Sequence, residues 1–357
     1  MSPIPQGQGS ALLAVLLVLI LASGCQSSGG ASVRREYTGT QMGLPWRIVL
    51  HAETSQKADA AAGAAFARIS ELNSILSDYE PTSELSRLSR SSGSGQSLPL
   101  SPDLARVLTR AETISKAGEG AFDVTVGPLV DVWKRARRQR TLPDPARIEA
   151  ARAATGWNQV VLGHDASGRP TARLLKPGMR LDLGGIAKGY AIDEATRVLR
   201  RHGIRRSLVS GGGDLFASGT PPGEPGWKIV VGRLDLTHAP PERTVWLRDR
   251  ALVTSGDLFQ RVEIDGVRYS HIVDPRTGQA LTDHSQVTLI GRETMTTDAL
   301  SKVLSVLGPD HTAPLRKQFG VEALLFRAPR GEVEVHETPG WHRHESRPTT
   351  GISGSTR

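Results

Sequence analysis

The sequence predicts an α+β protein with mixed sheets and flanking helices, and three observations lead to this prediction. Strand and helix patterns alternate from about Tyr37 to about Glu337 without a long low-complexity break. Their order is irregular rather than a strict strand-helix-strand succession, and no internal repeat is visible. Hydrophobic residues make up 38% and charged residues 22% of the 357 residues, which excludes collagen-like, coiled-coil and wholly disordered chains.

Helices are expected where apolar residues recur at helical spacing behind a capping residue. The first has Thr54 or Ser55 as its cap and an apolar face that ends at Leu76. The last ends at Gly308-Pro309, a pair that stops helices. The five expected helices cover, approximately, residues 55–76, 102–117, 145–155, 187–202 and 297–307.

Strands are expected in the intervals between these helices. A hairpin is indicated where Val262–Ile264 and Val267–Tyr269 alternate around Asp265-Gly266, a pair that suits a turn with positive φ. The other expected strands cover residues 46–50, 160–162, 180–183, 207–210, 227–231, 245–247, 252–254, 287–290 and 323–326.

The N-terminal residues predict export rather than a membrane-spanning helix. The apolar run over 11–22 has twelve residues, whereas a bilayer core needs about 20. The run overlaps Leu21-Ala22-Ser23-Gly24-Cys25, which resembles a bacterial lipobox, although residues 1–10 lack the expected Lys or Arg. Cleavage before Cys25 and attachment of lipid to its sulfur would anchor the protein to a membrane. The alternative is an ordinary secreted or buried cysteine.

These signals divide the chain into four parts. They are a lipoprotein signal peptide over 1–24, a flexible tether over 25–36, a folded domain over 37–340 and a polar tail over 341–357. The expected location is extracytoplasmic and membrane-anchored, on the periplasmic side of the inner or outer membrane. Cys25 is the only cysteine, which excludes an intramolecular disulfide framework and a thiolate zinc site.

The chain is basic, with 44 Lys and Arg residues against 36 Asp and Glu residues and a formal net charge of +8. Part of this charge forms a run of Lys134, Arg135, Arg137, Arg138 and Arg140. Nucleic acid is not expected as a partner, because the run follows a signal peptide and lacks interleaved aromatic residues. We expect a solvated face that meets anionic lipid headgroups or an acidic partner protein.

Four stretches place polar groups at strand ends or helix starts, where ligands commonly bind. Asp182–Tyr190 turns from a strand into a helix through Gly184-Gly185, so backbone N–H groups can approach a phosphate and Lys188 can neutralise an anion. The alternative is a structural turn with a solvated lysine. Ser210–Asp214 resembles a phosphate loop only loosely, and we expect a tight turn there.

The other two stretches carry groups for acid-base and metal chemistry. His271 and Asp274 offer an acid-base pair, unless Asp274 merely caps its own Asp-Pro-Arg-Thr-Gly turn. Asp298 and Ser301 are three residues apart on one expected helix, so two oxygen groups could meet a hard cation such as magnesium. The alternative at that position is an ordinary N-cap.

Taken together and in this order, these stretches resemble the ApbE family, the FAD:protein FMN transferases. The likeness extends from about Tyr37 to about Glu337 and includes Met42-Gly43 before the first strand. Two further motifs carry it, LSDYEPTSELS over 76–86 and GAFDVTVGPLV over 120–130. The lipobox agrees with the resemblance, because many members of the family are lipid-anchored outside the cytoplasm.

The resemblance implies a reaction in which FAD, the substrate, is cleaved at its pyrophosphate with the help of Mg²⁺. FMN would pass through a phosphoester bond to a Thr or Ser hydroxyl of an acceptor protein, and AMP would be released. The acceptor would be a flavoprotein subunit of a membrane electron-transfer complex. Two alternatives stay open: an FAD pyrophosphatase that forms FMN and AMP, and a non-catalytic flavin-binding lipoprotein.

The resemblance also implies roles for individual residues. The metal would be held by the backbone carbonyl of Gly185 and by Asp298 and Ser301. His271 would be the base for the acceptor hydroxyl, with Asp274 as its orienter. The residues implied to contact FAD are Met42, Tyr79, Ala121, Phe122, Asp123, Asp182, Lys188 and Val273.

One residue departs from the family pattern. Where the family usually has Thr directly after the position of Ser301, this chain has Lys302, an ammonium that cannot ligate magnesium. Either metal binding survives on fewer side-chain ligands plus water, or Lys302 points away, or a fixed charge partly replaces the cation. We expect weakened metal affinity rather than loss of activity.

Overall fold

A computed structural model of the chain describes residues 32–232, 234, 241–257, 260–329 and 331–345. The expected signal peptide, Cys25 and the residues after 345 lie outside these ranges. None of the helices within the ranges combines the length and the hydropathy that a bilayer crossing requires.

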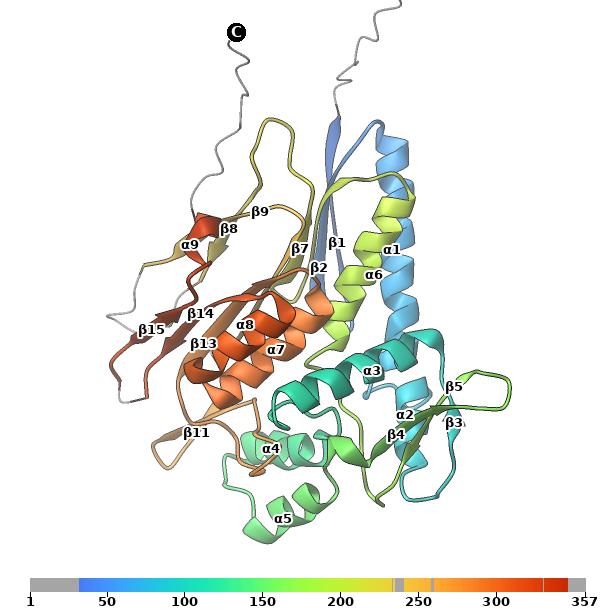
Figure 1. Cartoon of the computed structure of the whole chain (residues 1–357), viewed down its shortest axis with the longest axis vertical. Coiled ribbons are helices and arrows are strands. Elements are labelled where there is room, and N and C mark those ends of the chain that lie inside the picture. Colours follow the sequence, from blue (N-terminus) through green and yellow to red (C-terminus); the bar gives the residue numbers. More distant parts are fainter. Residues whose placement is uncertain (1–31, 233, 235–240, 258–259, 330, 346–357) are drawn as a thin grey trace, which may run out of the picture. The chain divides into compact units, whose positions relative to one another are not determined.

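An eight-stranded antiparallel sheet organises the fold (Figure 1). In spatial order its strands are β1 (Val33–Gln41), β2 (Leu44–Ala52), β6 (Arg206–Gly211), β7 (Asp214–Ser218), β10 (Arg250–Gly256), β13 (Ser285–Gly291), β14 (Glu322–Arg327) and β15 (Glu334–Glu337). Successive residues of a strand face opposite sides of a sheet. On β2, Ile48 and Leu50 belong to the main core, whereas Val49 packs in a second cluster on the other side. The sheet is therefore buried on both faces.

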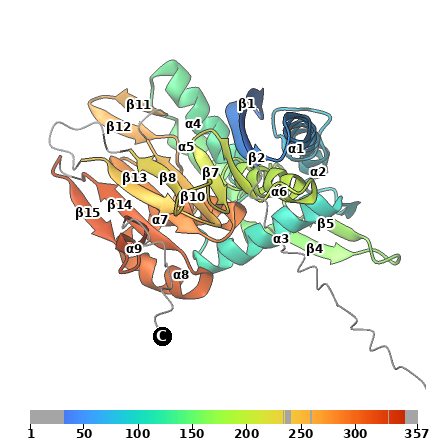
Figure 2. The same cartoon turned by 90° about the horizontal axis from the view of Figure 1, so that it is seen from above.

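Helices cover one face of this sheet, and a hairpin covers the other. Along the helical face, α1 packs on β1 and β2, α6 on β6 and β7, and α7 on β10 and β13 (Figures 1 and 2). These helices and their neighbours are α1 (Ser55–Leu76), α3 (Pro102–Ala117), α6 (Ala187–Arg201), α7 (Thr294–Leu307) and α8 (Thr312–Phe319). The second cluster packs under β8 (Trp227–Val231), β9 (Arg243–Leu247) and α9 (His342–Glu345).

A smaller group of elements adjoins this core. It contains β3 (Leu98–Pro99), β4 (Val160–His164), β5 (Pro170–Leu174), β11 (Arg261–Ile264), β12 (Val267–Ser270), α2 (Glu84–Arg90), α4 (Gly127–Gln139) and α5 (Pro145–Ala153). Trp133 of α4 holds part of it together, because its indole donates to the carbonyl oxygen of Gly278 at 2.9 Å and stacks on Tyr269. The stretch that carries His271 is thereby fixed to α4. Two short 3₁₀ turns, Trp157–Gln159 and Pro309–His311, complete the described elements.

The predicted α+β class and the five expected helices are confirmed. Thr54 and Ser101 cap α1 and α3 through their side-chain oxygens, as expected. Helix α7 begins three residues earlier than expected, because the carboxylate of Asp193 accepts hydrogen bonds from the N–H groups of Thr294 (2.9 Å) and Met295 (2.8 Å). A partner from another helix thus supplies the cap that the local sequence lacks.

The strand predictions are confirmed with two changes. The paired strands of the described residues all run antiparallel, so the sheets are not mixed. The strand expected over 180–183 is wrong, because Arg180 makes only an isolated bridge to Val126 and the N–H of Leu181 donates to the Ser89 hydroxyl at 3.1 Å. The Ser89 hydroxyl therefore accepts the hydrogen bond that the N–H of Leu181 would otherwise donate to a neighbouring strand.

Both predicted ends of the folded domain also change. Strand β1 begins at Val33, so residues 33–36 pair with β2 and are not part of a tether. Trp341 is fully buried in the second cluster, and its indole donates to Glu345 at 3.0 Å. The domain therefore reaches at least to Glu345, because a large apolar side chain near the end of the chain closes the core under the β8–β9 hairpin.

Candidate active site

The start of α6 packs tightly against the start of α7. A Cβ atom at Gly189 would lie 2.5 Å from the carbonyl oxygen of Thr294, so glycine is what allows the two helices to approach. The N–H of Gly189 then donates to Asp298 Oδ2 at 3.2 Å. The Asp298 side chain is fully buried at this contact. Gly189 therefore brings the first turn of α6 against the carboxylate of Asp298 on α7.

Lys302 points into this contact rather than away from it. Its ammonium donates to Asp298 Oδ1 at 2.7 Å and to Ser301 Oγ at 3.2 Å. Burial acts to raise the pKa of Asp298, but the ammonium groups of Lys302 and Lys188 lower that pKa below its usual value. Asp298 is therefore ionised in the folded protein at neutral pH.

A second lysine-aspartate pair lies beside the first. Lys188 forms an ion pair with Asp214, which is buried where the β6–β7 turn ends and also accepts from the N–H of Thr254 at 3.0 Å. Burial acts to lower the pKa of Lys188, yet Asp214 and Asp298 raise it above its usual value. The solvated-lysine interpretation of Lys188 is wrong. The expected tight turn over 210–214 is confirmed as the β6–β7 hairpin, with φ of 58° at Gly212 and 98° at Gly213.

The two side chains expected to hold magnesium, Asp298 and Ser301, are already engaged by other protein groups. A hydroxyl has one donor and two acceptor positions. Ser301 Oγ donates to the Asp298 carbonyl oxygen at 2.6 Å, lies 2.7 Å from Ser255 Oγ and accepts from Lys302. Magnesium demands near-octahedral oxygen ligation. Among the described residues, no three His, Cys, Asp or Glu side chains come together to hold a metal ion.

Gly185, Phe122 and Lys302 are neighbours at this point. A Cβ atom at Gly185 would lie 3.1 Å from Phe122 Cε2 and 3.2 Å from Lys302 Cγ. The residues expected to bind the metal and one of those expected to contact FAD therefore meet around the stem of Lys302. The carboxylate of Asp123 turns inward instead, and it accepts from the N–H of Thr125 and of Trp157, both at 2.7 Å. Because its oxygens hold this loop, the expected side-chain contact of Asp123 with FAD is not supported.

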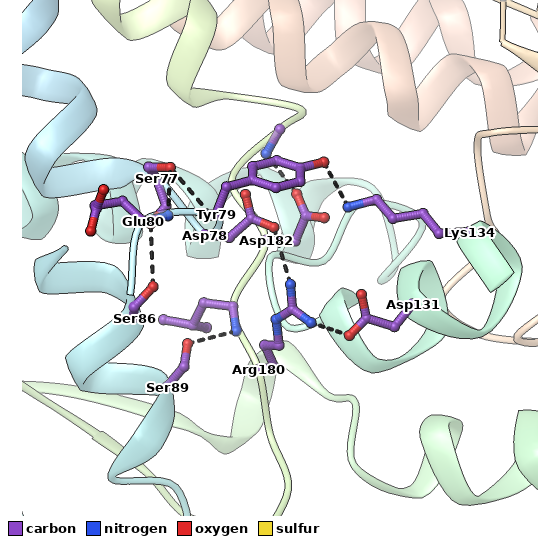
Figure 3. A network of polar contacts seen from close by, with 12 residues as sticks. Ser77, Asp78, Tyr79, Glu80, Ser86, Ser89, Asp131, Lys134, Arg180 and Asp182 are labelled. Carbon is purple, nitrogen blue, oxygen red and sulfur yellow. Dashed lines mark hydrogen bonds and ion pairs between the residues drawn. The ribbon is translucent and has the colours of Figure 1, made fainter. Parts of the chain in front are cut away.

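An aromatic ring and a lysine form an open platform next to α4 (Figure 3). The Tyr79 side chain is 75% exposed, its hydroxyl accepts from Lys134 Nζ at 2.8 Å, and the same ammonium lies 4.6 Å from the ring centroid. An exposed aromatic ring that is held in place by a neighbour suits stacking with a flat ligand ring.

Two carboxylates lie beneath this platform. Asp182 Oδ1 accepts from the N–H of Gly184 at 2.8 Å, and Asp78 accepts from Arg180 at 3.3 Å, while Arg180 also pairs with Asp131 (Figure 3). Burial, with the negative charge of Asp182 as a second cause, raises the pKa of Asp78. The pair suits hydrogen-bond donors of a ligand, such as ribose hydroxyls or ring nitrogens.

His271 is held neutral by its surroundings. Its Nδ1 lies 3.2 Å from the carbonyl oxygen of Gln260. Burial and then the positive charge of Lys302 lower the pKa of His271 to about 4, and Arg137 acts in the same direction. A neutral imidazole is able to take a proton from a hydroxyl.

Asp274 does not orient His271, and this expectation is wrong. Its carboxylate accepts from the Arg276 N–H and from the Arg276 guanidinium, with all three distances at 2.9 Å. The N–H of Gly278 donates to the carbonyl oxygen of Asp274 at 2.8 Å. The turn interpretation of this stretch is therefore confirmed, because a local backbone donor and an adjacent arginine satisfy the carboxylate first.

The three remaining residues expected to contact FAD are Met42, Val273 and Ala121. Met42 has a φ of 52° at the tip of the β1–β2 hairpin and is partly buried against the main core. Val273 is buried, and it forms an isolated bridge with Ala280 close to His271. Ala121 is buried as well, in the loop that carries Phe122.

Helix α4 contributes to the site, and the sequence did not indicate this. Four residues of the basic run lie on this helix, and Arg140 directly follows its last residue. Arg135, Arg138 and Arg140 are exposed, whereas Lys134 and Arg137 are partly buried. Spacing of three residues puts Lys134 and Arg137 on one side of a helix. This spacing is the one feature of the run that indicates a helix with a shared face. The start of α4 has no local signal, because Val126 at its N-cap makes no side-chain hydrogen bond.

Electrostatic effects join these groups into one site. Tyr79 acts on the pKa of Arg137, Lys302 and Arg137 both lower the pKa of His271, and Lys188 helps to lower the pKa of Asp298. The site thus combines an open aromatic ring, a cluster of cations and a neutral imidazole. These features define a class of α+β protein that binds an anionic ligand with a flat ring and has a base beside it.

Comparisons with known proteins show which family has this fold and these residues. A family model described as the ApbE family matches residues 42–325. Two relatives named FAD:protein FMN transferase come from Klebsiella pneumoniae (strain 342) and Treponema pallidum (strain Nichols). They are 30% and 32% identical, over 88% and 87% of this chain and 91% and 90% of theirs. The chain belongs to the ApbE family.

Solved structures of ApbE proteins have the same fold as this chain. The flavin transferase ApbE from Vibrio cholerae matches with a TM-score of 0.78 and 26% identity, over 88% of this chain and 100% of that one. The flavinyl transferase ApbE from Pseudomonas stutzeri matches with a TM-score of 0.76 and 27% identity, over 88% of this chain and 97% of that one.

Proposed function

We propose that this protein is an FAD:protein FMN transferase that attaches FMN to an acceptor protein and releases AMP. Two relatives with that name match this chain over 91% and 90% of their own length. The observation that carries the proposal is the combination of the open Tyr79 ring, the cations Lys188 and Lys302, and the neutral His271. A flavin dinucleotide has a flat ring at one end and a pyrophosphate in its middle, which is the ligand that these groups suit.

The reaction balances without any redox partner. The hydroxyl oxygen of an acceptor Thr or Ser forms a bond to the phosphorus of the FMN half of FAD. The bridging P–O bond breaks, AMP leaves with the electron pair, and His271 Nε2 takes the hydroxyl proton. Cations near the pyrophosphate stabilise the charge that develops on it, which is most of what a protein does in such transfers.

We assign the binding of FAD to Tyr79, Asp182 and Lys188. Tyr79 stacks on a ring of the ligand, Asp182 accepts hydrogen bonds from it, and Lys188 neutralises phosphate charge. Met42, Phe122 and the backbone near Ala121 and Val273 would line the same pocket. The magnesium ion expected at Gly185, Asp298 and Ser301 is left out of the reaction, because the donor set does not fit it.

The proposed location rests on the N-terminal sequence, and the proposed partner rests on the family resemblance. The lipobox supports a lipid anchor at Cys25 and an extracytoplasmic position at a membrane. A flavoprotein subunit of a membrane electron-transfer complex is then the acceptor that the enzyme can reach.

A transfer assay tests the function and separates it from its alternatives. The protein is mixed with FAD and an acceptor domain that the Vibrio cholerae flavin transferase flavinylates in a parallel reaction. We expect a fluorescent flavin band at the acceptor on a denaturing gel, with one AMP released per flavin attached. AMP without the band would instead indicate an FAD pyrophosphatase. Bound FAD without either product would indicate a non-catalytic flavin-binding lipoprotein.

The Tyr79 platform is expected to contribute to FAD affinity. Tyr79→Ala should weaken FAD binding about 3- to 10-fold, because stacking is lost. Tyr79→Phe is the matched control, since it keeps the ring and removes only the hydroxyl bonded to Lys134. Fluorescence titration of FAD checks both variants. Equal weakening in both would assign the effect to the hydroxyl rather than to the ring.

The low pKa of His271 predicts the acid limb of the pH profile. Because burial and Lys302 lower that pKa to about 4, kcat/KM for transfer should stay level as the pH falls from neutral and drop only near that value. Protonation removes the base, so the rate is lost on the acid side. An NMR titration of the imidazole checks the assignment. A midpoint near the ordinary value of 6.5 would contradict it.

A further inference from the structure

The Lys302 ammonium lies where the sequence predicts a divalent cation. It donates to both side chains expected to hold the metal, Asp298 at 2.7 Å and Ser301 at 3.2 Å. The Lys302 side chain is 19% exposed and that of Asp298 is not exposed at all. The pair is therefore anchored in the interior, while the Lys302 side chain stays partly exposed.

The charges around Lys302 are already balanced. Lys188 and Lys302 supply two positive charges, and Asp214 and Asp298 supply two negative ones. In the absence of FAD, a divalent ion added here would leave an excess of two positive charges among largely buried groups, which is unfavourable unless a lysine is displaced. In the free protein the four side-chain charges of the cluster therefore sum to zero without a metal.

The packing around Lys302 accommodates its long side chain. Residue 185 is a glycine, and a Cβ atom there would lie 3.2 Å from Lys302 Cγ, a tighter distance than ordinary packing allows. The Phe122 ring borders the same space, with its Cε2 at 3.1 Å from that Cβ position. The absence of a side chain at Gly185 thus leaves room for the aliphatic part of Lys302.

We propose that the Lys302 ammonium replaces the divalent cation at this site, so that FAD binding and FMN transfer proceed without a metal. This inference rests on the proposed function. An ammonium has three donors, and two of them are used on Asp298 and Ser301, so the third is free for a pyrophosphate oxygen. In the transfer step Lys302 remains protonated and neutralises charge on the departing AMP phosphate. It gives up no proton and forms no covalent bond.

Metal binding tests this proposal without any need for activity. Loss of the EPR signal of free Mn²⁺ reports binding to the protein. We expect Lys302→Thr, which removes the ammonium and adds an oxygen, to bind Mn²⁺ at least about 10-fold more tightly than the wild type. Lys317→Thr is the matched control, because Lys317 is an exposed lysine on α8, and it should behave as the wild type. Wild-type binding as tight as that of Lys302→Thr would overturn the proposal.

Transfer in the presence of EDTA tests it during the reaction. The wild type should transfer FMN in EDTA at a rate within about twofold of its rate in excess magnesium. Lys302→Met keeps the length of the stem and removes the charge, so it should weaken FAD binding about 10- to 100-fold in EDTA, the loss expected for a hydrogen bond to a charged group. Thermal melting establishes that both variants fold.

The outcomes separate this inference from the proposed function. A wild-type rate that is abolished by EDTA and restored by magnesium would overturn the role of Lys302 and leave the transferase function intact. Unchanged FAD affinity in folded Lys302→Met would overturn that role as well. Absence of both acceptor flavin and AMP release, with and without magnesium, would remove the proposed function itself.

Discussion

Asp298→Asn is expected to lower the free energy of unfolding by about 3 to 5 kcal/mol, the cost of removing one partner of a buried ion pair. Asp298 is fully buried and accepts a hydrogen bond from Lys302, and its charge also supports Lys188. Asparagine keeps the size and loses the charge, so Lys302 loses its ion-pair partner, while Lys188 keeps Asp214. Urea unfolding followed by circular dichroism measures the change.

Two further variants establish the cause. Asp310→Asn changes the same residue types at an exposed position before α8, so it should alter stability by no more than about 0.5 kcal/mol. The double variant Asp298→Asn with Lys302→Met removes both charges of the pair, and it should be more stable than Asp298→Asn alone. A double variant no more stable than the single one would show that the ion pair is not what Asp298 stabilises.

His271→Ala is expected to lower the rate of FMN transfer about 10²-fold or more while leaving FAD affinity nearly unchanged. The imidazole is neutral, and the Gln260 carbonyl contacts its Nδ1, which directs the other nitrogen to the role of base. Single-turnover transfer and FAD titration, measured on the same preparation, separate the two effects.

His164→Ala provides the control for this variant, because His164 is exposed on β4 away from the site. It should match the wild type in both rate and affinity. If His271→Ala loses FAD affinity by the same factor as rate, the residue belongs to the binding site and another group removes the proton.

The sequence predicts the elements whose signals are local. Thr54 and Ser101 sit directly before periodic apolar residues, and the structure begins α1 and α3 where these caps indicate. Asp265-Gly266 predicts the β11–β12 turn for the same reason, with φ of 51° and 75° at the two residues. A cap or a turn involves only neighbouring residues, so its physics is fully present in a short stretch.

Features that depend on distant partners are the ones the sequence does not reveal. Helix α4 lacks a side-chain cap at Val126 and is held by the contact of Trp133 with Gly278, which lies 145 residues further on. Trp341 resembles part of a polar tail in the sequence, yet the β8–β9 hairpin buries it. No local pattern records either partner.

The candidate site shows the same division. The order of motifs predicts which residues gather near α6 and α7, and the departure at Lys302 is visible in the sequence. The direction of its side chain is not, because that depends on the space left by Gly185 and on the acceptor that Asp298 provides. The sequence does not predict the orientation of Asp274 for a similar reason, since Arg276 competes with His271 for its carboxylate.

We propose that this protein moves FMN from FAD to a protein hydroxyl, and mass spectrometry of the acceptor domain, after reaction with purified enzyme and FAD, detects this transfer. We expect an acceptor that is heavier by one FMN less one water, on a Thr or Ser side chain. We expect no such change when His271→Ala replaces the wild type for the same short time. An acceptor of unchanged mass, in a reaction where the Vibrio cholerae flavin transferase modifies the same preparation, would contradict it.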